Sequence, residues 1–70
     1  MEPFSYKNMG QRMRRRRVEK CLSVETLAGM MHMSAETVKA YEYGKRRMQI
    51  ETLVVYCRIV DLPVEKVLFG

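Results

Sequence analysis

The sequence predicts an all-α fold, because apolar residues recur at helical intervals and no stretch alternates as a strand would. Ser5, Ser23 and Ser34 each precede such an apolar run, at the position of a helix N-cap. Gly44 follows another run as a C′ residue, and Pro63 suits the first turn of a helix. Together these signals predict five short helices that cover most of the chain.

Each expected helix begins at one of these signals or at the return of the apolar period. The expected helices are Tyr6–Glu19, Val24–Met31, Ala35–Tyr43, Ile50–Val60 and a short helix opened by Pro63. Apolar spacing assigns the following residues to the core: Met9, Met13, Leu27, Ala28, Met31, Met33, Val38, Tyr41, Ile50, Leu53, Val54, Cys57 and Val60. The apolar residues of the short fifth helix are Val64, Val67 and Leu68.

Length and composition set outer bounds on the function. A chain of 70 residues predicts one domain over residues 1–70, with residues 1–5 as an N-terminal extension. This size leaves no room for a walled cofactor cleft, so we expect no cofactor. The chain carries 13 Lys and Arg against 8 Asp and Glu, and this net charge of +5 favours a polyanionic partner. Charge alone does not separate DNA from RNA or from an anionic membrane.

Features of several other protein classes are missing from the sequence. There is no signal peptide and no apolar stretch long enough to span a bilayer, so we expect a cytoplasmic protein that binds no membrane. Cys21 and Cys57 lie far apart without metal-ligand spacing, which indicates free thiols in a reducing compartment. His32 is the only histidine, and no paired carboxylates or Gly-rich loop are visible, so an enzyme is not expected.

Residues 22–47 are the most informative segment for function. They contain two short helical patterns joined by a tight turn, followed by Gly44 and three basic residues. Ala28 is small at mid-helix, as two closely crossing helices require. This spacing is typical of a DNA-binding helix-turn-helix, in which the second helix enters the major groove.

The chain also resembles the phage repressor and Cro type of helix-turn-helix domain, the XRE family, over about residues 9–69. MGQRMRRRR resembles the opening helix of that family, LSVETLAGMMHMSAETVKAYEYGKRR its helix-turn-helix and loop, and IETLVVYCRIVDLPVEKVLFG its last two helices. The resemblance implies a five-helix, lambda-repressor-like domain of a transcriptional regulator that binds double-stranded DNA as a homodimer.

Several positions depart from the family pattern. His32 stands at a turn position that is usually glycine, and histidine is among the residues that tolerate a positive φ there. Val24 replaces a glutamine that holds a phosphate in the family, and Cys21 replaces a glycine between the first two helices. Arg16 occupies an inward position that is usually leucine, so we expect its stem to pack while its guanidinium reaches water.

The third helix has one inward and one outward side. At 100° per residue, Ser34, Val38 and Tyr41 share the inward side. The residues expected nearest the base edges are Ala35, Glu36, Lys39 and Ala40. The alternative is that Glu36 and Lys39 are only a solvated surface.

Basic residues directly after this helix are candidates for phosphate contacts. Lys45, Arg46 and Arg47 lie in the following loop, and the Tyr43 hydroxyl could add a hydrogen bond to a phosphate. The alternative reading of the loop is a patch that only improves solubility.

The run from Arg14 to Arg17 cannot form one patch, because consecutive helical residues point in different directions. We expect Arg14 and Arg15 to face solvent and Arg17 to point inward. The family resemblance pairs Arg17 with Glu42 in a partly buried salt bridge.

The fourth and fifth helices offer a candidate dimer interface. Val55 and Ile59 lie roughly opposite the core side of the fourth helix, and Leu68 and Phe69 add apolar surface at the end of the fifth. A two-fold dimer would place two recognition helices on a palindromic operator, and repression by occluding polymerase is then the simplest mechanism.

Two alternatives from other functional classes remain. The first is an antitoxin-type module that binds a partner toxin and represses its own operon; the near absence of chain beyond the domain, at Gly70, speaks against it. The second is non-specific binding to RNA or to an anionic membrane, which a plain basic amphipathic helix would serve and a capped helix-turn-helix does not favour.

Overall fold

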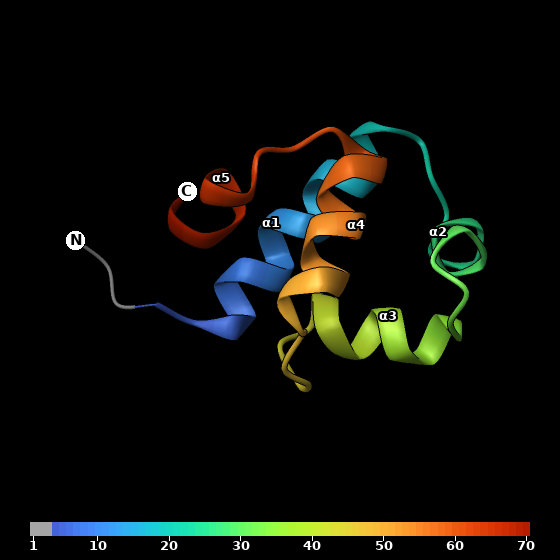
Figure 1. The fold of residues 1–70 in the computed structure, drawn as a ribbon, viewed down its shortest axis with the longest axis horizontal. Helices are drawn as coiled ribbons and strands as arrows, with labels where there is room; N and C mark the ends of the chain where they lie inside the picture. Colours follow the sequence, from blue (N-terminus) through green and yellow to red (C-terminus); the bar gives the residue numbers. More distant parts are fainter. Residues whose placement is uncertain (1–3) are drawn as a thin grey trace.

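A computed structural model describes residues 4–70, and over this range the chain contains five α-helices and no strand (Figure 1). The helices are α1 (Tyr6–Glu19), α2 (Val24–Met30), α3 (Ala35–Glu42), α4 (Ile50–Val60) and α5 (Val64–Phe69). The expected all-α class is therefore confirmed. Of the expected N-terminal extension, residues 1–3 lie outside the described residues.

The first three helices begin where the serine signals predict. The side-chain oxygens of Ser5, Ser23 and Ser34 accept hydrogen bonds from backbone N–H groups three residues later, at 3.2, 3.0 and 3.2 Å. Each serine thereby satisfies one N–H group that has no partner within its own helix.

Three of the predicted helix boundaries were off by one residue. Helices α2 and α3 end at Met30 and Glu42, one residue earlier than expected, with Met31 and Tyr43 as their C-caps. Pro63 is the N-cap of α5 rather than a residue of its first turn. The last turn of a helix frays easily, and such boundaries depend on the geometry that follows.

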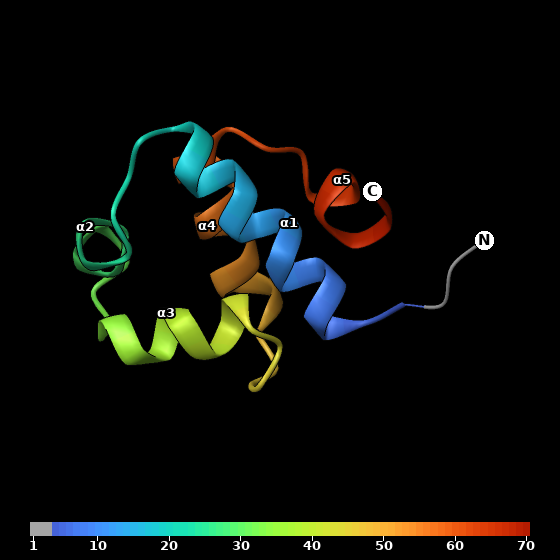
Figure 2. The ribbon, with the colours of Figure 1, turned by 180° about the vertical axis from the view of Figure 1, so that it is seen from behind.

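The helices are arranged around a central crossing. Helices α1 and α4 pass each other in the middle of the molecule, while α2 and α5 lie at opposite ends of its long axis (Figures 1 and 2). Helix α3 runs along one edge, from the neighbourhood of α2 to the start of the loop that leads to α4 (Figure 1). It packs against both α2 and α1, so this edge is supported from two sides.

A single core cluster joins all five helices. Its fully or nearly fully buried members are Met9, Met13, Leu27, Ala28, Val38, Leu53, Tyr56, Cys57, Val60 and Val67. The assignment of Ile50 to the core was wrong, since this first residue of α4 is 59% exposed. Tyr56, absent from the expected core, is completely buried. A tyrosine can be buried in this way when its hydroxyl finds a partner, which Tyr56 does.

A residue with positive φ follows each of the first four helices. The φ angles are 58° at Cys21, 58° at His32, 72° at Gly44 and 56° at Asp61. This left-handed conformation turns the chain back so that it can meet the last carbonyls of the helix. At Gly44 glycine is also required by space, because a Cβ there would lie 2.6 Å from the Cα of Lys7 in α1.

Candidate nucleic-acid interface

The turn between α2 and α3 holds the two helices in contact. Ala28 is 2% exposed, and its small side chain allows the two helices to pack closely. The backbone N–H of His32 donates to the carbonyl of Gly29 at 3.2 Å, and that of Met33 donates to the carbonyl of Ala28 at 3.0 Å. These bonds close the end of α2 and fix the direction in which α3 begins.

Helix α3 presents two chemically different faces. Val38, Tyr41 and Glu42 are buried, while Glu36 and Lys39 are exposed. Ala35 and Ala40 are partly exposed beside them. Ser34, expected on the inward side, is exposed because its hydroxyl caps the helix instead of packing in the core.

A buried ion pair anchors the C-terminal end of α3 to α1. The Nε of Arg17 donates to Oε2 of Glu42 at 2.8 Å, and Nη2 donates to Oε1 at 3.1 Å. This is the pair that the family resemblance implies. Both side chains are largely inaccessible to water, at 13% and 1% exposure. The hydrogen bond to Glu42 raises the pKa of Arg17, so the guanidinium remains charged.

Tyr56 extends this pair to α4. Its hydroxyl donates to Oε2 of Glu42, with an oxygen–oxygen distance of 2.6 Å, and lies 3.1 Å from the carbonyl oxygen of Met13. Burial, followed by the hydrogen bond to the Glu42 carboxylate, raises the pKa of Tyr56. The resulting junction of Arg17, Glu42 and Tyr56 connects α1, α3 and α4 at one buried point. Sequence reasoning missed Tyr56, although it follows Leu53 by three residues on the buried side of α4.

Close approach of α1 to α3 depends on a glycine that sequence reasoning also missed. A Cβ on Gly10 would overlap the backbone carbonyl of Glu42. Gly10 therefore allows the two helices to cross at backbone distance beside the junction, where any larger residue would push α3 away.

Two arginines of α1 hold the ends of the last two helices. Nε and Nη2 of Arg16 donate to the carbonyls of Val60 and Asp61 at 3.0 and 2.9 Å. The Arg16 side chain remains 31% exposed, so its guanidinium reaches water as expected. It was not expected that the same group also donates to carbonyls at the end of α4, which lack helical partners. Arg12, one turn earlier, donates to the carbonyl of Val67 at 3.0 Å.

The remaining arginines of the run also differ from one another. Arg15 is exposed, as expected. Arg14 is not free in solvent, because its guanidinium carbon lies 4.7 Å from the centroid of the Tyr43 ring. The aromatic face attracts the cation and shields part of it from water, so Arg14 is only partly exposed, whereas it was expected to face solvent.

The loop after α3 brings its basic residues beside the same helix. Lys45, Arg46 and Arg47 are exposed. The guanidinium of Arg46 lies 5.8 Å from the ring centroid of Tyr41, and that of Arg47 lies 5.9 Å from that of Tyr6. The Lys45 N–H donates to the carbonyl of Ala40 at 2.9 Å, which ties the start of the loop to α3. The loop and α3 consequently present exposed basic groups next to one another.

The residues proposed for dimerisation differ in how much surface they offer. Val55 and Phe69 are 43% and 72% exposed. Ile59 and Leu68 are half-buried and pack against the core, so they contribute less free surface. Ile50, 59% exposed, adds apolar surface on α4 that was not expected.

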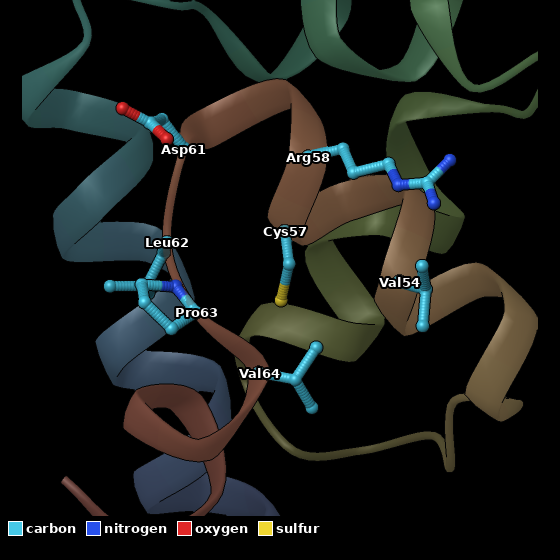
Figure 3. A pocket seen from close by; sticks show the side chains of 7 residues that line it. All are labelled: Val54, Cys57, Arg58, Asp61, Leu62, Pro63 and Val64. Carbon is cyan, nitrogen blue, oxygen red and sulfur yellow. The ribbon is translucent and has the colours of Figure 1, made fainter.

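A hollow between α4 and the segment leading to α5 is lined by Val54, Cys57, Arg58, Asp61, Leu62, Pro63 and Val64 (Figure 3). The Cys57 sulfur points into it, whereas the charged ends of Arg58 and Asp61 point in opposite directions. Burial raises the pKa of the Cys57 thiol, which disfavours the reactive thiolate. Cys57 and the exposed Cys21 are both free. Within residues 4–70 no group of three or more acidic, His or Cys side chains could hold a metal ion.

Among residues 4–70, no helix combines the length and apolar composition that crossing a bilayer requires.

Comparisons with known proteins agree with this arrangement. A family model described as a helix-turn-helix domain matches residues 8–68. A search of curated protein sequences finds no match. Among solved structures, the restriction-modification controller protein C.AhdI from Aeromonas hydrophila has a TM-score of 0.81 and 27% identity, over 89% of this chain and 94% of that one.

Two further structures are similar. The S. venezulae BldD DNA-binding domain has a TM-score of 0.78 and 25% identity, over 90% of this chain and 94% of that one. The clp gene regulator ClgR from C. glutamicum shares the fold, with a TM-score of 0.83 at 24% identity over 94% of this chain and 86% of that one. The capped α2–turn–α3 unit, the five-helix arrangement and the family match lead to one assignment: the chain belongs to the helix-turn-helix domain family, as a DNA-binding, lambda-repressor-like domain of the XRE/Cro type.

Proposed function

We propose that residues 1–70 act as one DNA-binding domain of a transcriptional regulator that reads a specific double-stranded sequence. In this proposal a homodimer binds a palindromic operator and represses transcription by occluding polymerase. The observation that carries it is the outward face of α3, flanked by an exposed basic loop and anchored from behind by the junction of Arg17, Glu42 and Tyr56.

The exposed side chains of α3 have the chemistry to read bases in the major groove. Glu36 can accept a hydrogen bond from a cytosine amino group, and Lys39 can donate to O6 or N7 of guanine. The methyl groups of Ala35 and Ala40 can contact thymine methyls. Because these residues lie on one helix that packs against both α1 and α2, their relative positions are fixed by the fold.

The loop would supply affinity without sequence preference. Lys45, Arg46 and Arg47 can neutralise phosphates next to the groove, and the Tyr43 hydroxyl can donate to another. The two arginines lie over tyrosine rings, which restricts their motion before DNA arrives. The similarity to the controller protein C.AhdI and to the BldD DNA-binding domain supports a role in gene regulation.

A dimer would double the length of DNA that is read. One α3 spans only a few base pairs, whereas two copies separated by about one helical turn of DNA would read both halves of a palindrome. The exposed Val55 and Phe69, with the half-buried Ile59 and Leu68, supply candidate apolar surface for a two-fold contact.

Selection of binding sites from genomic DNA by the purified protein tests the function directly. We expect enrichment of one palindromic motif. Lys39→Ala and Glu36→Ala should then change the preferred bases, with a loss of about 1–3 kcal/mol per base contact. Arg46→Ala and Arg47→Ala should weaken all sequences alike and reduce the salt slope by about one for each lost phosphate contact. Loop variants that altered base preference while helix variants did not would show that the reading face is misassigned.

Sedimentation of the protein with and without the selected site tests the dimer. We expect two protein chains per palindrome, and weaker pairing in Val55→Glu, whose new charge would be buried in the interface. A monomer at micromolar concentration on and off the DNA would rule out the dimer. A protein that enriches no DNA sequence at all would contradict the regulatory function and favour partner binding of the antitoxin type.

A further inference from the structure

Arg14 and Tyr43 come from different helices and meet at the surface. Arg14 is on α1, while Tyr43 is the C-cap of α3, and the guanidinium carbon lies 4.7 Å from the ring centroid. Tyr43 is 53% exposed and Arg14 is half-buried. The contact places a cation from outside the helix-turn-helix directly beside the end of α3.

Arg14 differs from its neighbours in how its donors are used. Arg12, Arg16 and Arg17 donate to protein oxygens, and these bonds hold helices together. Within residues 4–70 the Arg14 guanidinium donates to no protein oxygen, although it lies over the Tyr43 ring. A guanidinium that stacks by its face still presents N–H groups along its edge, in the geometry that suits a phosphate.

We infer that Arg14 and Tyr43 act as one unit at the DNA backbone, in which the ring holds the Arg14 guanidinium so that it donates to a phosphate beside the one that the Tyr43 hydroxyl contacts. This inference rests on the proposed function and extends the interface from α3 and its loop onto α1. The ring also restricts the side chain in advance, which lowers the entropy lost when DNA binds.

The arrangement repeats around the end of α3. Arg46 and Arg47 of the loop also lie over tyrosine rings, those of Tyr41 and Tyr6. Arginines from both α1 and the loop are thus held against aromatic faces next to the C-terminal end of α3. Arginine is well suited to this use, because it stacks on rings and pairs with phosphate through different parts of the same group.

The first test compares two neighbouring charges of α1 in DNA-binding assays on the selected operator. Arg14→Met and Arg15→Met each remove one positive charge from α1, at a partly exposed and at an exposed position respectively, so the long-range field changes about equally. We expect Arg14→Met to weaken binding by about ten-fold and to reduce the salt slope by about one. Arg15→Met should change affinity by less than about two-fold. Equal effects of the two substitutions would refute a contact by Arg14.

The second test asks whether the two residues act together. In a double-mutant cycle, the effect of Arg14→Met should shrink to about two-fold when Tyr43 is already alanine, because the guanidinium has lost its support. Arg14→Lys keeps the charge without the planar head and should lie between wild type and Arg14→Met. Additive losses of affinity in the cycle, or an Arg14→Lys variant that binds DNA like the wild type, would refute joint action of Arg14 and Tyr43. Wild-type protein that binds no DNA would instead refute the proposed function itself. Unchanged melting temperatures of all variants would exclude misfolding as the cause.

Discussion

The N-terminal part of the molecule, α1–α3, and the C-terminal part, α4–α5, reach the same packed state by different means. In the first part, Ser5, Ser23 and Ser34 cap their own helices through residues three positions away. In the second part, Gln49 and Pro63 make no side-chain cap hydrogen bond. The ends of α4 and α5 are instead held by Arg16 and Arg12 from α1.

The two parts therefore differ in whether nearby or distant residues stabilise the ends of their helices. Helices α1–α3 carry their start signals in their own sequence, so their local structure forms largely from nearby residues. Helices α4 and α5 depend on groups that α1 brings to them across 44 and 55 positions of the chain. Helix α3 begins at a local cap, at Ser34, and ends at a distant contact, where Glu42 enters the buried junction.

Breaking the junction should have the largest effect, because it joins both parts of the molecule. Glu42→Gln leaves the Arg17 guanidinium without a charged partner in a nearly dry site, and we expect unfolding to become easier by about 3–5 kcal/mol. Urea unfolding monitored by circular dichroism measures this loss. Glu19→Gln, which removes the charge of Glu19 from its exposed pair with Arg16 within α1, is the matched control and should change stability little. A Glu42→Gln protein as stable as wild type would contradict the anchoring role.

Removing only the α4 side of the junction should have a smaller, pH-dependent effect. Tyr56→Phe deletes a hydrogen bond to a charged group, worth about 1.5–3 kcal/mol at neutral pH. The raised pKa of Tyr56 means that the folded protein keeps the phenol proton while the unfolded chain loses it above about pH 10. Stability of the wild type should therefore fall above that pH, by up to about 1.4 kcal/mol per pH unit from this group.

Thermal melts of both proteins from neutral pH to about pH 11 test the sign of this effect. We expect the difference in stability between the wild type and Tyr56→Phe to become smaller above about pH 10, since the variant lacks the titrating group. A difference that widened with pH would mean that the phenol is not held protonated in the fold.

The arginines of α1 that donate to the ends of α4 and α5 should stabilise the C-terminal part more than the N-terminal part. Arg16→Met leaves the carbonyls of Val60 and Asp61 without their donor, and we expect a loss of about 1–2 kcal/mol. Hydrogen exchange should increase in α4 and α5 more than in α2 and α3. The neighbouring Arg15→Met removes the same charge from an exposed position and serves as the control. Uniform loss of protection over all helices would argue against separate dependence of the two parts.

The smallest loss of stability should come from removing a local helix cap, and it should occur in α3 but not in α4. Ser34→Ala removes the N-cap of α3 and should reduce stability by about 1 kcal/mol. Gln49→Ala, at the N-cap position of α4, removes no cap hydrogen bond and should be close to neutral. Equal losses at the two positions would show that the helices do not differ in their local signals.

Local patterns predicted most of the fold and the exposed face of α3. The three serine caps, Gly44 and the turn at His32 depend on residues a few positions apart, which a sequence displays directly. Outward positions of Glu36 and Lys39 followed from helical periodicity alone. The ion pair of Arg17 with Glu42 could be named in advance only through family resemblance, since its members lie 25 positions apart.

Tertiary structure alone decided how identical residue types are used. Arg14, Arg15, Arg16 and Arg17 are adjacent, yet they meet a tyrosine ring, solvent, helix-end carbonyls and a buried carboxylate. Burial of Tyr56 and exposure of Ile50 likewise depend on what stands opposite each residue. The sequence by itself determined which segments become helices and which side of α3 faces outward, because those properties arise from neighbours along the chain. The partners of the arginines and of Tyr56 were decided only by the packing of α1 against α3, α4 and α5, because that packing brings together groups that the chain keeps far apart.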